Sequence, residues 1–230
     1  MGLFNFSRKT FKHGVHPPEY KNETNGLPIR QFPFAPVIIL PLVQHIGAPS
    51  ELVVREGQEV ARGQLLAKAG GYVSVPLHAP VSGTIRKMAN VPTISGKMVQ
   101  GIYLEAFPGS SQEVLNGRPV DLDTATPEEI LQGSQDAGIV GLGGAAFPTH
   151  VKLKVPEGKN CEFLIINGIE CEPYLTTDHR VMLEQGEDIL TGIKYLLKAT
   201  GAKRAIIGIE ANKQNAADHL RRLIPEEAPV

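Results

Sequence analysis

The sequence contains few cysteines, no large excess of either charge and no long apolar run. Cys161 and Cys171 are the only cysteines in 230 residues. They are too few for a disulfide scaffold and lack metal-cluster spacing, so a reducing cytoplasmic setting fits best. The formal net charge of −1 gives no basic excess, which argues against a nucleic-acid partner. No apolar stretch approaches the roughly 18 residues of a membrane span, and residues 1–14 lack the apolar core of a secretory signal.

The composition is that of an ordinary globular protein, with 42% hydrophobic and 20% charged residues. A chain of this length can form one large domain or two modest ones, each with its own core. The longest apolar run, residues 34–43, is interrupted twice by proline. We therefore expect a buried strand at this position.

Residues 1–30 are polar and contain several turn signals. Pro17 and Pro18 exclude a helix there, and Asn25-Gly26 favours a turn. These features predict an extended arm that lies on another part of the protein. His13 and His16 are candidate metal ligands, but no cysteine or carboxylate partner is close in the sequence, which argues against a metal site.

Residues 31–108 have the pattern of a β-rich domain, because short apolar runs alternate with glycine-containing turns. The string VREGQEVARGQLLA, followed by APVSGTI, resembles the barrel-sandwich hybrid fold of biotinyl and lipoyl carrier domains. In carriers a lysine at a hairpin tip bears the cofactor, but the corresponding residues 70–76 contain no lysine. The resemblance therefore implies the carrier fold without the carrier chemistry, and a structural or docking role.

Residues 109–126 are rich in Gly, Pro, Ser and Asp and are predicted to be a linker. A helix should follow and run to about Ala137. Thr126 is a good N-cap, Pro127 suits the first helical position, and Glu129 completes a capping box.

A glycine-rich stretch, residues 136–154, comes after this helix. It contains Gly138, Gly141, Gly143 and Gly144, followed closely by Pro148. A glycine bend that leads into a helix exposes backbone N–H groups and the positive end of a helix dipole, which suits a phosphate or another anion. The alternative is a tight loop that packs against a neighbouring segment.

The last hundred residues alternate between strand and helix patterns. Residues 161–166 and 205–209 are apolar runs of strand length, whereas residues 178–199 and 213–223 have helical periodicity. This βαβα order predicts a parallel, Rossmann-like sheet. Asn167, Glu170 and Glu172 follow the first strand, where ligands bind in such sheets. A G-x-G-x-x-G motif directly after a strand is absent, so spacing alone indicates only a phosphate-bearing ligand.

Two stretches carry a more specific resemblance. GLGGAAFPTHVKL (residues 141–153) and INGIECEPYLTTDHR (residues 166–180) resemble the paired flavin and NADH motifs of the respiratory complex I flavin subunit. Residues 11–18, 40–49 and 76–83 resemble motifs of the C-subunit family of the Rnf ion-translocating ferredoxin:NAD oxidoreductase complex. These segments together extend over nearly the whole chain, which is similar to the amino-terminal part of that protein.

The resemblance implies a set of cofactor contacts. Backbone groups of the glycine loop would hold the FMN phosphate and ribityl chain, namely those of Gly141, Gly143, Gly144 and Ala145. Phe147 would stack on the nucleotide and Lys152 would face phosphates, although core packing and a solvated helix lysine are the plainer interpretations. Asn167 would hydrogen-bond FMN, and Glu170 and Glu172 would line the nicotinamide and flavin site. For the two glutamates the plainer interpretation is an exposed turn.

Three positions depart from the complex I pattern: Ile169 replaces Asp, Cys171 replaces Ser, and His150 replaces Gly. Polar FMN contacts are therefore not expected from residues 169 and 171. We expect Cys171 to be a buried thiol rather than a redox centre. The family also has a later loop that closes the flavin site and two cysteine runs that bind [4Fe–4S] clusters, and this chain can hold neither cluster.

We therefore predict an α+β chain with two domains: a barrel-sandwich hybrid (31–108) and a Rossmann-like FMN/NADH-binding domain (127–230) that is incomplete at its carboxyl end. An extended arm (1–30) precedes the first domain, and a linker (109–126) joins the two. The resemblance implies an electron-entry subunit that passes electrons between NAD(H) and ferredoxin through FMN and iron–sulfur clusters. The flavin supplies the chemistry, so no side chain need be catalytic. Expected partners are the other Rnf subunits, ferredoxin and NADH, at the cytoplasmic side of the bacterial membrane. A flavin/iron–sulfur cobalamin reductase and a non-catalytic docking module are the alternatives.

Overall fold

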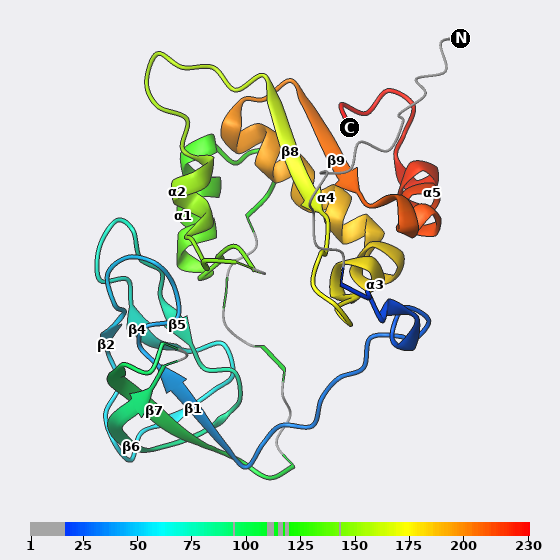
Figure 1. Ribbon diagram of the computed structural model, residues 1–230. Helices are drawn as coiled ribbons and strands as arrows, with labels where there is room; N and C mark the ends of the chain where they lie inside the picture. Colours follow the sequence, from blue (N-terminus) through cyan, green and yellow to red (C-terminus); the bar gives the residue numbers. More distant parts are fainter. Residues whose placement is uncertain (1–16, 94, 110–112, 115–116, 118–119, 143) are drawn as a thin grey trace.

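The computed structural model describes residues 17–93, 95–109, 113–114, 117, 120–142 and 144–230. Figure 1 shows a β-rich lobe that carries β1 to β7 and a second lobe that carries all five α-helices with β8 and β9. His13, His16 and Gly143 lie outside the described residues. None of the helices in the described ranges is long and apolar enough to span a bilayer.

The β-rich lobe consists of two antiparallel sheets. The first has the order β1-β7-β6-β3 and the second the order β2-β4-β5. Their bounds are β1 Val37–Pro41, β2 Glu51–Leu52, β3 Glu59–Val60, β4 Leu65–Lys68, β5 Leu77–His78, β6 Gly83–Pro92 and β7 Met98–Ala106. Leu66, Val81, Ile85, Ile102 and Leu104 are fully buried in the core of this lobe. The predicted β-rich first part is confirmed.

Strand β1 is an edge strand, which corrects the prediction of a buried one. It pairs only with β7, and its side chains alternate between the core and solvent, with Val37 47% and Ile39 48% exposed. An apolar run cannot reveal whether a strand has one neighbour or two, because β-pairing depends on distant segments.

The second lobe is built around two parallel strands, β8 (Phe163–Gly168) and β9 (Arg204–Ile209). Phe163 is opposite Arg204, and Gly168 is opposite Ile209. Its helices are α1 (Pro127–Asp136), α2 (Thr149–Leu153), α3 (Thr177–Glu184), α4 (Gly186–Thr200) and α5 (Gln214–Leu223). Two 3-10 turns, η1 (Lys21–Glu23) and η2 (Ala211–Lys213), complete the described elements. One face of the strand pair packs on α4 through Ile193 and Leu197.

Helix α1 begins as the sequence predicts. The Thr126 side chain accepts a hydrogen bond from the Glu129 amide at 3.2 Å, and the Glu129 carboxylate accepts one from the Thr126 amide at 2.7 Å. This reciprocal pair is a capping box and satisfies two amides that the helix itself leaves unpaired.

The single helix predicted over residues 178–199 is in fact two helices, which break at Gln185 (φ −131°, ψ 32°). The break brings Gly186 against α5, where a Cβ on this glycine would lie 2.7 Å from Leu223 Cδ1. The apolar periodicity continues through the break, so the sequence pattern did not show it.

The two lobes meet along one side of α1 and α2. His150 Nε2 lies 2.8 Å from the Tyr72 carbonyl oxygen, and Gln135 Nε2 donates to the Ser74 carbonyl at 3.1 Å. The Ile46 amide donates to the Ala146 carbonyl at 3.4 Å. The glycine-rich stretch therefore starts and ends close to the β-rich lobe.

Candidate nucleotide site

The glycine-rich stretch forms a loop whose two ends are tied together. The Gly141 amide donates to the Phe147 carbonyl and the Thr149 amide to the Ile139 carbonyl, both at 3.0 Å. Between these bonds, Ala146 is held to the β-rich lobe through its carbonyl, whereas Leu142 at the tip is 92% exposed. A narrow neck and an exposed tip are what a backbone cradle for a ligand requires, whereas a packed loop would bury its tip.

Lys152 lies directly over this loop. A Cβ added to Gly141 would be only 2.7 Å from Lys152 Nζ, so the absence of a side chain at residue 141 makes room for the ammonium group. Within the described ranges no carboxylate lies within 4 Å of Lys152 Nζ. The loop therefore carries a positive charge that no carboxylate of the described residues neutralises, which suits a phosphate.

The other predicted residues of the loop differ in their exposure. Gly144 and Ala145 are exposed, and nothing lies within 4 Å of a Cβ built on Gly144. Phe147 is half-buried. Pro148 is the N-cap of α2 rather than part of its first turn, and α2 has only five residues. A helix of this length adds little dipole, so the loop amides and Lys152 remain the main anion-attracting groups.

The segment after β8 contains the other predicted site residues. Asn167 is exposed, and its Oδ1 accepts a hydrogen bond from the Ile169 amide at 3.2 Å. Glu172 is also exposed. Cys171 is exposed as well, which corrects the expectation of a buried thiol. Within the described chain, no hydrogen bond joins this segment to the glycine loop.

Glu170 points into the protein, unlike its neighbours. The side chain is 2% exposed, Oε1 accepts from the Asp178 amide at 2.6 Å, and Oε2 accepts from the His179 amide at 3.2 Å and from Lys213 Nζ at 2.8 Å. Burial opposes the charged form, but these hydrogen bonds outweigh it and lower the pKa of Glu170. The carboxylate caps the start of α3, where the Thr176 side chain makes no capping bond.

Lys213 is the partner that the sequence interpretation missed. It is 2% exposed and also forms an ion pair with Glu210 Oε2 at 2.7 Å. Burial opposes its charge, yet the two carboxylates raise the pKa of Lys213 above its usual value. Glu210 is the first residue after β9, and Glu170 is the second residue after β8. The rule that carboxyl ends of parallel strands meet would have placed the two glutamates near each other.

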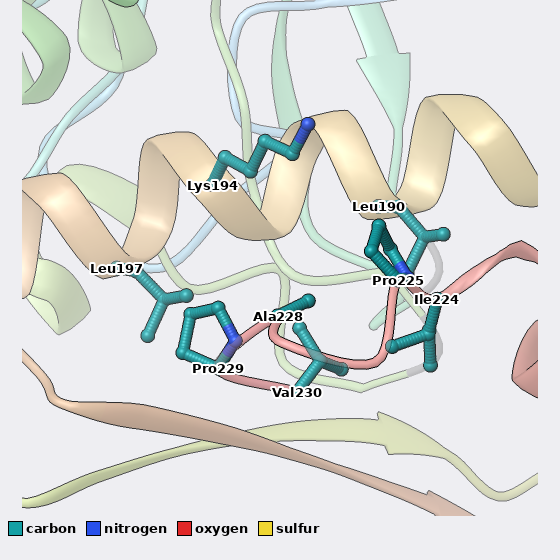
Figure 2. A pocket seen from close by; sticks show the side chains of 8 residues that line it. All are labelled: Leu190, Lys194, Leu197, Ile224, Pro225, Ala228, Pro229 and Val230. Carbon is teal, nitrogen blue, oxygen red and sulfur yellow. The ribbon is translucent and has the colours of Figure 1, made fainter.

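Two hollows in the described structure are lined by other residues. Figure 2 shows one of them, an apolar pocket between α4 and residues 224–230 that is lined by Leu190, Leu197 and Val230 among others. The other lies between residues 183–188 and α5, beside His219 and Leu223. Neither hollow is lined by a predicted site residue.

Comparison with known proteins agrees with this division into two parts. Residues 9–107 match the family model for the RnfC barrel sandwich hybrid domain, and residues 134–229 match that for the Nuo51 FMN-binding domain. The second match includes every predicted site residue. The chain is similar to C subunits of ion-translocating oxidoreductase complexes, two of which are named as ferredoxin:NAD(+) oxidoreductases.

Three relatives of the Rnf type illustrate the similarity. The C subunit of the Na(+)-translocating ferredoxin:NAD(+) oxidoreductase complex of Acetobacterium woodii is 38% identical over 97% of this chain and 51% of the relative. The proton-translocating counterpart from Clostridium ljungdahlii is 38% identical over 93% of this chain and 47% of the relative. The C subunit of the ion-translocating oxidoreductase complex of Haemophilus influenzae (strain 86-028NP) is 40% identical over 92% of this chain and 32% of the relative. The chain thus spans about half the length, or less, of these Rnf relatives.

Proposed function

We propose that this chain is the FMN- and NAD(H)-binding part of an electron-entry subunit in an Rnf-type complex that exchanges electrons between NAD(H) and ferredoxin. The match of residues 134–229 to an FMN-binding domain and the names of the relatives support this proposal. The observation that carries it is the Lys152 ammonium, which lies over Gly141 in an exposed loop inside the FMN-binding match.

The residues present fit a flavin mononucleotide. The glycine loop, through Gly141, Gly143, Gly144 and Ala145, would surround the phosphate and ribityl chain, and Lys152 would neutralise the phosphate. The half-buried ring of Phe147 would stack on the nucleotide. When bound, FMN would accept a hydride and release electrons singly.

The segment after β8 would receive the nicotinamide. Asn167 and Glu172 are exposed there and would hydrogen-bond the flavin and the dinucleotide. Glu170 would act differently from Glu172, because its carboxylate is bound by Lys213 and two amides. We assign Glu170 the task of fixing the turn from which Glu172 projects.

The same proposal covers the organisation and partners of the protein. Residues 1–30 would be an arm, 31–108 a docking domain, 109–126 a linker and 127–230 a Rossmann-like domain. The protein would associate peripherally with other Rnf subunits on the cytoplasmic side of the membrane. This chain has only two cysteines, so the [4Fe–4S] clusters would be held by cysteines outside these 230 residues.

The test is FMN titration of the purified full-length protein, followed by reduction with NADH. We expect saturable quenching of flavin fluorescence and bleaching of the flavin on addition of NADH. Glu172→Ala should slow flavin reduction at least tenfold while FMN stays bound. Absence of saturable FMN binding would rule out the proposal, and unchanged reduction kinetics would remove Glu172 from the site.

A further inference from the structure

The amino-terminal arm contacts the segment after β8, which contains the predicted nucleotide-binding residues, through a buried lysine. Lys21, in η1, is 7% exposed. Its Nζ donates to the carbonyl oxygens of Glu170 at 2.5 Å, Leu175 at 2.9 Å and Glu172 at 3.2 Å. An ammonium group has three N–H bonds, so all three are used within one turn of six residues.

The charge of Lys21 has no counter-ion in the described chain, where no carboxylate lies within 4 Å of its Nζ. Burial of an unpaired charge is expensive unless its hydrogen bonds are satisfied. The three carbonyl groups supply those bonds, and they do so only in the backbone conformation that aims all of them at one point. The lysine and the turn therefore fix each other.

Further contacts join the arm to the same turn. The Tyr174 amide donates to the Glu19 carbonyl at 2.8 Å, and Thr24 Oγ1 donates to the Tyr174 carbonyl at 2.9 Å. The rings of Tyr20 and Tyr174 stack with centroids 4.9 Å apart and planes within 8°. Figure 1 shows η1 beside α3 and the turn that precedes it.

Both tyrosines have left-handed backbone conformations, with φ of 50° at Tyr20 and 65° at Tyr174. Such conformations are unfavourable for residues with a side chain and persist where surrounding contacts determine them. The hydrogen bonds from Lys21, Thr24 and the Tyr174 amide are those contacts. A strained turn held at several points is rigid, and rigidity is what a site for a reacting group needs.

We propose that Lys21 is a positioning residue of the nucleotide site. Its ammonium fixes the backbone of residues 170–175 and so sets the position from which the exposed Glu172 meets the nicotinamide of NAD(H). Lys213 fixes the same turn from the other side through the Glu170 carboxylate. This inference rests on the proposed function, and it assigns the arm to the site although about 150 residues separate them in the sequence.

The test is Lys21→Met in the full-length protein, which keeps the length of the side chain and removes the charge and the donors. Lys203→Met, in an exposed turn before β9, is the matched control. We expect Lys21→Met to raise amide hydrogen exchange in residues 170–176 at least tenfold. It should also raise the KM for NADH about tenfold and lower kcat for flavin reduction, with the Kd for FMN within twofold of wild type.

Two outcomes would overturn the proposal. The first is unchanged amide hydrogen exchange in the turn. The second is faster exchange with unchanged NADH kinetics, because Lys21 would then only anchor the arm. If Lys21→Met fails to fold, Thr24→Val removes one bond to the same turn and should change KM in the same direction, about threefold. Failure of the proposed function is distinguishable, because the wild type itself would then bind no FMN. Failure of the Lys21 proposal leaves a flavin-binding wild type and a variant with equal NADH kinetics.

Discussion

Lys213 Nζ lies 2.8 Å from Glu170 Oε2, with both side chains only 2% exposed, beside the carboxyl ends of two adjacent parallel strands. At this edge of a sheet, polar side chains are usually interpreted as ligand-binding residues. Here one carboxylate is fully occupied by protein donors, whereas the next one in the sequence, Glu172, is exposed. The motif therefore contains one structural glutamate and one that is available to a ligand.

This difference predicts a large effect on stability for one glutamate and almost none for the other in unfolding experiments. Glu170→Gln should reduce the free energy of unfolding by about 3 kcal/mol, because it leaves a buried lysine with one carboxylate fewer. Glu172→Gln, two residues away and exposed, should change it by less than about 0.5 kcal/mol. Urea denaturation followed by circular dichroism measures both. Equal effects would show that Glu170 is not part of a buried ion pair in solution.

The stability of the protein should depend on pH through the same pair. The pKa of Glu170 is lowered in the folded state, so its contribution is present above the unfolded value of about 4.3 and is lost as pH falls through the folded pKa. The pKa of Asp178 is raised, by burial and by Glu170, and this offsets part of the loss. The raised pKa of Lys213 keeps its contribution below about pH 10.4, and the contribution disappears as pH rises through the folded pKa.

The measurement is the free energy of unfolding from pH 2 to 7 for wild type and Glu170→Gln. Wild type should lose more stability than the variant below about pH 4.3, so the two curves should converge on acidification. Parallel curves would contradict the assignment of this acid-sensitive contribution to Glu170.

Lys152 should contribute to FMN affinity, whereas its neighbour Lys154 should not. Lys152→Ala removes the charge over the glycine loop and should weaken FMN binding about tenfold to a hundredfold, the range for a hydrogen bond to a charged group. Lys154 lies over the Tyr72 ring at 5.3 Å from its centroid, so Lys154→Ala is the matched control. Fluorescence titration gives both Kd values, and equal values would remove Lys152 from the phosphate site.

Gly141→Ala should act through Lys152. The new methyl group would lie 2.7 Å from the ammonium nitrogen, and the flexible lysine would move away at little cost in stability. FMN affinity should fall as it does in Lys152→Ala, and the double variant should be no weaker than either single one, since both remove the same contact. Gly144→Ala, where the added methyl group meets nothing within 4 Å, is the control for stability. Additive losses of affinity would show that the two residues act separately.

Local signals in the sequence predicted the elements whose causes are local. Thr126, Pro127 and Glu129 lie within four residues, and α1 starts as expected with a capping box between Thr126 and Glu129 and with Pro127 as its first residue. The parallel pairing of β8 and β9 followed from alternating strand and helix patterns.

Features that depend on distant partners were missed for a physical reason. The helix break at Gln185 depends on the contact between Gly186 and α5. The inward orientation of Glu170 depends on Lys213, 43 residues later. Neither partner is recognisable from the residues around it. The roles of individual residues toward FMN and NAD(H) came from family resemblance and remain predictions.

The hydrogen bonds of Lys21 also constrain the order in which the protein can fold during synthesis. Its three acceptor carbonyls belong to residues 170, 172 and 175, so they leave the ribosome long after the lysine. At about 5–20 residues per second, the intervening chain takes roughly 7 to 30 s to be made. The β-rich lobe can close in that interval because its strands lie within residues 37–106. The arm cannot attach until these carbonyl groups have been synthesised, so its attachment should be among the last steps of folding.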